Sequence, residues 1–165
     1  MKTLFLLRHG TPIEKTAKIT DKDRALLTIG RREIKTIGER LKDASFRMDR
    51  IITSPALRAL QSAKIILAAL KLPSLEISTE EALYKAQNIE NIVQIIQCLD
   101  NRFNTVLFVG HNPLFEEFSN FVGLSPKRRL PPAGLVGIKF AVDTWREIAI
   151  TDGEIVYSAF PDEIS

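Results

Sequence analysis

Apolar segments typical of buried β-strands alternate along this chain with segments of helical periodicity. Residues 4–7 and 105–109 are almost continuously apolar, as expected for strands that are covered on both faces. Between them, Ile34, Ile37 and Leu41 recur at helical spacings within residues 28–41. The alternation predicts an α/β fold, a three-layer α/β/α sandwich with a mostly parallel central sheet.

Shorter segments extend this pattern. Residues 51–53 and 75–78 predict two more strands, the second at a sheet edge, and residues 89–99 predict an amphipathic helix. Residues 134–142 and 145–151 predict a hairpin that turns at Asp143-Thr144. The sequence has no internal repeat and no linker, so residues 1–165 are expected to form a single domain.

Two further helices are predicted from their first residues. Ser54 is a favourable N-cap and Pro55 a favourable first helical residue, so a helix is expected from there to about Leu70. Asn112-Pro113 is expected to start another helix.

The charge balance argues against a nucleic-acid partner. Of 165 residues, 23 are basic and 20 acidic, a net charge of +3 that is spread evenly. The short cluster Lys127-Arg128-Arg129 is bounded by prolines and is expected to be a solvated loop, with a contact to an acidic partner as the alternative.

The cysteine count and the amino terminus bear on the compartment. Cys98 is the single cysteine, which excludes an internal disulfide; its apolar surroundings predict a buried thiol. Arg8 ends the first apolar run after four residues, too few for a secretory signal, and no other stretch is long enough for a membrane span. The expected location is therefore cytoplasmic, without membrane contact.

The chain has two histidines, and each follows a predicted buried strand. His9 lies in Arg8-His9-Gly10 after residues 4–7, and His111 lies in Gly110-His111 after residues 105–109. Ligands of open α/β sheets bind beyond the carboxyl ends of the strands, so both imidazoles face one crevice if these strands are neighbours. The alternatives are two structural histidines or a pair of metal ligands; the fixed charge of Arg8 opposes a cation there.

A third element is Ser54-Pro55-Ala56-Leu57-Arg58. It places Arg58 in the first turn of the predicted helix, beside unpaired backbone N–H groups and the positive end of the helix dipole. This position suits a phosphate. Taken without the histidines, an exposed surface arginine is the more common outcome.

Together, Arg8-His9-Gly10, Ser54-Pro55-x-x-Arg58-Ala59 and Gly110-His111 resemble the histidine phosphatase superfamily, the phosphoglycerate mutase-like fold. The short length, residues 24–26 and Gly30 make the chain most similar to short bacterial protein-phosphohistidine phosphatases of the SixA type. The resemblance implies that His9 is the nucleophile that becomes phosphorylated and that Arg8, Arg58 and His111 hold the phosphoryl oxygens. It implies no metal and no cofactor.

Two departures from the family pattern affect the substrate. Ester-cleaving members carry an acidic proton donor after the middle strand; Glu81 is the possible donor here, and a solvated surface carboxylate is the alternative. Imidazole leaves more readily than an alkoxide when no acid is present. In the segment after Arg24, Ala25 and Leu27 replace the usual proline and threonine. Arg24 and Thr11 are expected to bind substrate or phosphate, with surface and turn roles as alternatives.

The leading functional hypothesis is a phosphatase that acts on a phosphorylated histidine of a partner protein. The second is a phosphatase for a small phosphorylated substrate, a phosphomonoester, with Glu81 as the acid. The third is an inactive module that binds phosphate or a phosphoprotein.

Overall fold

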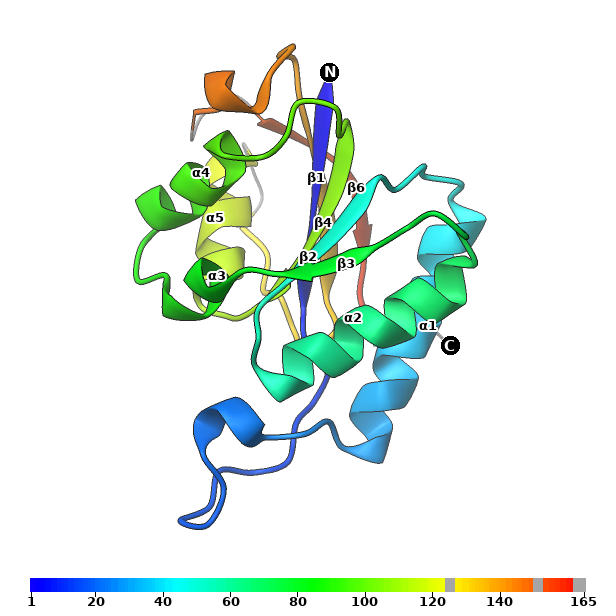
Figure 1. Cartoon of the computed structure of the whole chain (residues 1–165), viewed down its shortest axis with the longest axis vertical. Helices are drawn as coiled ribbons and strands as arrows, with labels where there is room; N and C mark the ends of the chain where they lie inside the picture. Colours follow the sequence, from blue (N-terminus) through cyan, green and yellow to red (C-terminus); the bar gives the residue numbers. More distant parts are fainter. Residues whose placement is uncertain (124–126, 150–152, 162–165) are drawn as a thin grey trace.

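A six-stranded sheet forms the centre of the computed structural model, which describes residues 1–123, 127–149 and 153–161. Its strands lie in the order β3-β2-β4-β1-β5-β6 (Figure 1). They span β1 (Lys2–Arg8), β2 (Arg50–Thr53), β3 (Ile77–Thr79), β4 (Thr105–Gly110), β5 (Leu135–Phe140) and β6 (Gly153–Ala159). The strand β5 is antiparallel to both β1 and β6, whereas the other pairings in this sheet are parallel, so the predicted, mostly parallel sheet is confirmed.

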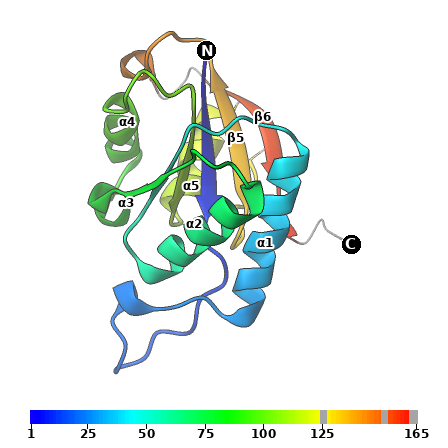
Figure 2. The ribbon, with the colours of Figure 1, turned by 45° about the vertical axis from the view of Figure 1, so that its right-hand side comes forward.

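Helices cover both faces of the sheet, which makes the three predicted layers (Figures 1 and 2). The helices α1 (Thr28–Asp43) and α2 (Leu57–Leu70) pack together on one face. The helices α3 (Glu81–Lys85), α4 (Ile89–Gln97) and α5 (Leu114–Val122) lie on the other. Two 3-10 turns, η1 (Asp21–Asp23) and η2 (Trp145–Glu147), lie in the connections. None of the described helices is both long enough and apolar enough to cross a bilayer.

The alternation of side chains along β1 explains why its sequence is apolar at every position. Leu4 and Leu6 belong to the core under α4 and α5, whereas Phe5 and Leu7 belong to the core under α1 and α2. Successive side chains of a strand point to opposite faces, so a strand buried on both faces has no polar alternation.

The register between β1 and β4 decides where the histidines lie. These two strands are parallel neighbours, and Arg8 at the end of β1 is paired with Gly110 at the end of β4. The residues that follow, His9 and His111, therefore leave the sheet at the same edge. The sequence-based condition that these strands be adjacent is confirmed.

The predicted hairpin at residues 134–151 is correct in its pairing and wrong in its second strand. β5 does pair with β6 in antiparallel fashion, but β6 begins at Gly153, and Trp145 lies in η2. The reason is a capping box, in which the Glu147 carboxylate accepts hydrogen bonds from the Thr144 N–H and hydroxyl at 2.8 and 2.9 Å. The last two predicted strand residues, Ile150 and Thr151, lie outside the described residues.

Two local predictions are corrected. The α2 helix begins at Leu57, so Ser54 and Pro55 precede it, and the N-cap position belongs to Ala56. Cys98 is exposed. It follows Ile96 by two residues, about 200° around a helix, so it points away from the face on which Ile92 and Ile96 pack against the core.

Candidate active site

A polar pocket of about 580 Å³ opens at the carboxyl ends of β1 and β4. It is lined by both histidines and by three arginines: Arg8, His9, Pro12, Asp21, Arg24, Arg58, Tyr84, His111 and Asn112. The predicted convergence of two imidazoles with Arg8 and Arg58 is therefore present in the structure.

The orientation of His9 is set by its own neighbour in the chain. The buried ring places Nδ1 2.7 Å from the carbonyl oxygen of Gly10. A carbonyl only accepts hydrogen bonds, so Nδ1 carries the proton and Nε2 has a lone pair. The Nε–H of Arg58 donates to this Nε2 at 3.3 Å. The unprotonated nitrogen of His9 thus faces Arg58 in the pocket.

Both imidazoles are held in the neutral form. Burial lowers the pKa of His9 to about 3, and the charges of His111, Arg58 and Arg8 act in the same direction. Burial likewise lowers the pKa of His111 to about 4, again with the help of Arg58. The ring centroids lie 5.2 Å apart. Two neutral imidazoles are therefore presented at neutral pH.

His111 is tied to the segment that precedes α2. Its Nε2 lies 2.7 Å from the Ser54 hydroxyl oxygen, which also accepts a hydrogen bond from the Ala56 N–H at 3.2 Å. The N–H of Ser54 donates to the carbonyl of Val109 at 2.9 Å. Ser54, expected to be a helix cap, instead connects β4 and its histidine to the start of α2.

Arg8 reaches the pocket from the end of β1. Its Nη1 donates to the carbonyl oxygen of Leu130 at 3.0 Å, and Asn112 donates to the same oxygen at 2.8 Å. Its buried Nε has no hydrogen-bond partner among the described residues. A buried N–H without a partner is costly, and a bound oxyanion is one group that satisfies it.

Asp21 is a pocket residue that sequence reasoning missed. Its Oδ2 accepts from the Tyr84 hydroxyl at 2.8 Å and from Nη2 of Arg58 at 3.1 Å, and its Oδ1 accepts from Arg24 at 3.1 Å. Burial opposes ionisation of this carboxyl, but the hydrogen bonds from Tyr84, Arg24 and Arg58 outweigh it and hold its pKa well below the usual range. The i, i+3 pair Asp21 and Arg24 is the signal that the sequence offered.

The three other candidate site residues, Arg24, Glu81 and Thr11, differ in whether they line the pocket. Arg24 lines the pocket, where its Nη1 pairs with Asp21. Glu81 does not line it; it lies in the first turn of α3, and its carboxylate pairs with Lys22 of η1 at 2.9 Å. Thr11 is also absent from the lining, because its backbone is fixed between Glu33 and Leu27, and Pro12 takes the place beside the pocket.

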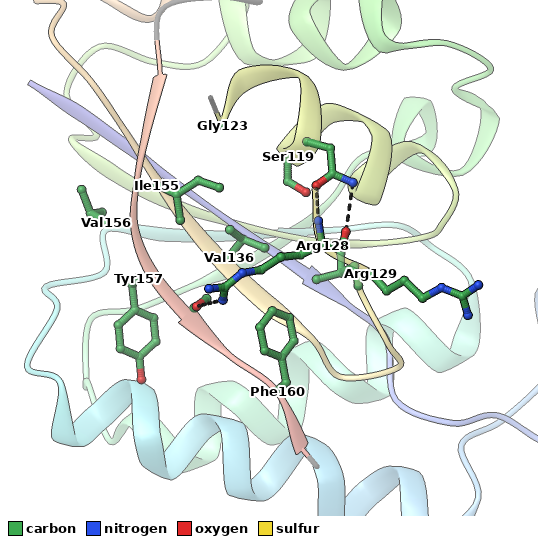
Figure 3. A pocket seen from close by; sticks show the side chains of 12 residues that line it. Ser119, Gly123, Arg128, Arg129, Val136, Ile155, Val156, Tyr157 and Phe160 are labelled. Atoms are coloured by element: carbon green, nitrogen blue, oxygen red, sulfur yellow. Dashed lines mark hydrogen bonds between the residues drawn. The ribbon is translucent and has the colours of Figure 1, made fainter. Parts of the chain in front are cut away.

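A second, more apolar groove shows that shape alone does not locate the site. It measures about 500 Å³ and lies between β6, α5 and the segment that carries Arg128 (Figure 3). Arg128 reaches Ser158 at 3.3 Å, and its backbone is paired with Asn120. None of the residues that line it is a histidine or an acid. Both histidines and the Asp21 carboxylate lie instead in the pocket of His9.

The acidic and imidazole side chains are not arranged as a metal cage. Within residues 1–123, 127–149 and 153–161, no three His, Cys, Asp or Glu side chains are placed to hold one metal ion. Asp21, which lines the pocket with the histidines, is already paired with Arg58 and Arg24.

Comparison with known families identifies the superfamily of the chain. The sequence profile of the histidine phosphatase superfamily (branch 1) matches residues 4–87, just over half of the chain. The chain belongs to this superfamily. An uncharacterised protein of Picosynechococcus sp. is 26% identical over 96% of both chains. Members of the histidine phosphatase superfamily act on phosphorylated substrates, and the chain is a phosphatase of this superfamily.

Solved structures share the whole fold of this histidine phosphatase. The protein histidine phosphatase SixA in complex with tungstate superposes with a TM-score of 0.80, at 21% identity and 99% coverage of both chains. A candidate SixA phosphohistidine phosphatase from Nakamurella multipartita gives 0.81, at 22% identity, with 97% of this chain and 96% of that chain covered. One from Agrobacterium tumefaciens gives 0.77 at 22% identity, covering 96% and 97%. The phosphoglycerate mutase-like fold is thereby confirmed.

Proposed function

We propose that this histidine phosphatase hydrolyses phosphohistidine on partner proteins, with His9 as the group that carries the phosphoryl between two steps. The observation that supports this most directly is the state of His9. Its Nε2 is unprotonated, because Nδ1 donates to Gly10, and its lowered pKa of about 3 keeps the ring neutral at neutral pH.

In the first step, the lone pair on Nε2 of His9 attacks phosphorus while the P–N bond of the substrate breaks. The substrate ring is protonated on its second nitrogen, so it leaves as neutral imidazole with the electron pair of that bond on its first nitrogen. In the second step, water attacks phosphorus, the electron pair of the new P–N bond returns to Nε2, and the water releases a proton to solvent. No metal takes part in this scheme.

The cations around the pocket act on the phosphoryl oxygens in both steps. Arg58 and Arg8 both line the pocket and supply fixed positive charge. His111 offers a neutral ring 5.2 Å from His9. Such fixed donors stabilise the charge of the transferring group without reorganisation, which is the main catalytic device for phosphoryl transfer.

The carboxylates favour a nitrogen leaving group over an alkoxide. Asp21 is the acid that lines the pocket, and its lowered pKa leaves it ionised and unable to donate a proton near neutral pH. Glu81 lies outside and pairs with Lys22. An alkoxide needs a proton as it leaves, whereas an imidazole that is already protonated on its second ring nitrogen leaves as a neutral molecule. Similarity in fold to the tungstate-bound protein histidine phosphatase SixA points in the same direction.

The test compares 1-phosphoimidazole and a phosphohistidine-containing protein with p-nitrophenyl phosphate and 3-phosphoglycerate. We expect kcat/KM for the phosphoramidates to exceed that for the esters by at least tenfold. Acid-sensitive, base-stable 32P should appear on the wild-type enzyme after a rapid quench and be absent in His9→Ala. Faster turnover of the esters would replace this proposal by the phosphomonoesterase hypothesis. Unlabelled wild-type enzyme with unaltered phosphoprotein binding in His9→Ala would favour a binding module.

A further inference from the structure

A carboxylate inside an anion-binding pocket requires a reason. The pocket contains three guanidinium groups, from Arg8, Arg24 and Arg58, and both of its histidines are neutral. Asp21 adds one negative charge to the same lining. This charge weakens the attraction for the phosphoryl group itself, so it is expected to serve another part of the substrate.

The Asp21 carboxylate is firmly held and still has capacity to accept a hydrogen bond. Tyr84 of α3 and Arg58 of α2 both donate to Oδ2, and Arg24 donates to Oδ1. Arg58 also donates through Nη1 to the backbone oxygen of Asp21 at 2.7 Å. A carboxylate accepts about four hydrogen bonds. Among the donors that the described residues supply, three are used, which leaves one acceptor position on Oδ1.

This carboxylate lies close to the place where the leaving group must be. A single guanidinium separates it from the attacking nitrogen, because Arg58 donates through Nε to Nε2 of His9 and through Nη2 to Asp21. Its charge also acts on His111, whose pKa it raises against the larger effect of burial. A substrate ring bound opposite His9 therefore lies within the field of Asp21.

We infer that Asp21 is a specificity-determining residue that recognises the leaving imidazole of the substrate through the N–H on its second ring nitrogen. This inference rests on the proposed phosphohistidine phosphatase function and deepens it. The Asp21 carboxylate accepts that N–H and stabilises the ring-protonated, cationic form of the phosphorylated imidazole.

Protonation of the substrate ring beside Asp21 also balances the protons of the first step. A phosphorylated imidazole that is protonated on its second nitrogen becomes a neutral imidazole when the P–N bond breaks. The bond's electron pair remains on the first nitrogen, and the N–H beside Asp21 stays where it is. No proton has to move at the moment of cleavage, so the pocket works without a general acid.

The same charge discriminates against other substrates. A phosphate ester offers no N–H to Asp21, and a leaving group with its own carboxylate is repelled by it. Removal of the charge should therefore affect the phosphoramidate and the oxyanion in opposite directions.

The experiment is Asp21→Asn, with Asp23→Asn as the matched control because Asp23 is an exposed aspartate of the same turn, η1, and does not line the pocket. In Asp21→Asn we expect kcat/KM for 1-phosphoimidazole to fall by about 10²-fold. Cleavage of p-nitrophenyl phosphate should stay within threefold, and inhibition by tungstate should tighten several-fold. Asp23→Asn should change none of these values by more than threefold.

A merely structural role gives a different pattern. If Asp21 only positions Arg58, its loss weakens tungstate binding and lowers both activities together, and that result would overturn the inference. Tyr84→Phe provides the second variant, because it keeps the carboxylate and removes one donor to it. It should retain the preference of the wild-type enzyme for 1-phosphoimidazole over the ester, and loss of that preference counts against Asp21.

The pH profile gives an independent readout. Protonation of the substrate ring is favoured by Asp21 and opposed by Arg58 and Arg24; the groups that surround the carboxylate also include Tyr84 and His111. For 1-phosphoimidazole, kcat should fall above the pKa of the bound ring. Asp21→Asn should move this descending limb to lower pH by about one unit. An unmoved limb contradicts the inference.

The outcomes separate the two proposals. Wild-type enzyme that cleaves esters faster than 1-phosphoimidazole refutes the phosphohistidine function. Wild-type enzyme that prefers 1-phosphoimidazole, with the same preference in Asp21→Asn, refutes only the role of Asp21.

Discussion

Arg58 is the side chain through which the main parts of the site are joined. Its Nε–H donates to Nε2 of His9, the proposed nucleophile, and its two terminal nitrogens donate to the backbone oxygen and the side chain of Asp21. The side chain is buried although it is charged, which a protein tolerates when the charge is paired and hydrogen-bonded. The guanidinium has five N–H groups, so two remain for a phosphoryl group.

Arg58→Ala is expected to lower kcat by about 10²–10³-fold, the usual cost of losing one fixed transition-state donor. The effect should be mainly on kcat, measured with 1-phosphoimidazole by steady-state kinetics. Arg32→Ala is the control, since Arg32 is an exposed arginine on α1. Activity of Arg58→Ala within tenfold of the wild type would remove Arg58 from the proposed machinery.

The residues of the pocket differ in how far the sequence reveals them. His9 and His111 follow apolar runs that identify buried strands, and neighbouring parallel strands end at one edge, so their meeting was predictable. Asp21 follows no periodic pattern, and its partners Arg58 and Tyr84 lie 37 and 63 positions away. Only the tertiary fold places such residues together. The position of Glu81 in the chain makes it a candidate proton donor, but the direction of its side chain depends on how α3 packs.

At the scale of elements, two glycines allow the segment after β1 to pass closely over α1. A Cβ on Gly10 would lie 2.6 Å from the backbone oxygen of Gly30, and a Cβ on Gly30 would collide with the backbone oxygen of Thr11. Backbone atoms cannot rotate away as a side chain can. This contact fixes how close the segment that carries His9 lies to α1.

Gly30→Ala should therefore impair both stability and catalysis. We expect a loss of about 1–3 kcal/mol in the free energy of unfolding and a clear fall in kcat, because the Thr11 backbone must move and His9 moves with it. Gly38→Ala is the matched control: its Cβ would meet the Ala69 side chain at 2.6 Å, between α1 and α2. Urea unfolding should detect both changes, and only Gly30→Ala should lower activity. Equal activity losses would show that the effect of Gly30→Ala is general.

The strands and long helices were predictable because apolar periodicity determines them, and the hairpin shows where that signal fails. Trp145 and Ile148 are apolar and buried, as strand residues would be, yet Trp145 begins a 3-10 turn and Ile148 is its C-cap. The competing signal was the capping box formed by Thr144 and Glu147, which is visible in the sequence but local in nature. Burial patterns alone do not distinguish such a turn from a strand.

At the scale of the whole molecule, the two neutral histidines make stability depend on pH. Their pKa values in the folded chain are about 3 and 4, whereas an unfolded histidine has a pKa of about 6.5. Between these values the unfolded chain binds protons that the folded chain does not, so stability falls as pH falls below about 6.5. Asp21 does not titrate in this window, because its pKa is held well below the usual range.

The free energy of unfolding is expected to decrease by about 2–4 kcal/mol between pH 7 and pH 5. Urea titrations in buffers free of phosphate measure it directly. His9→Asn should remove about half of the difference. A slope that is the same in His9→Asn and in the wild type would show that His9 ionises normally in the folded chain.

The position of β4 also governs the order in which the molecule can assemble. β1 and β2 each pair with β4 and not with one another. The strand β4 therefore lies between two strands that are synthesised before it. During synthesis on the ribosome, the segments bearing His9 and Arg58 emerge long before residue 110. Until then the sheet lacks the strand between them. The pocket can therefore form on the nascent protein only when β4 pairs with β1 and β2.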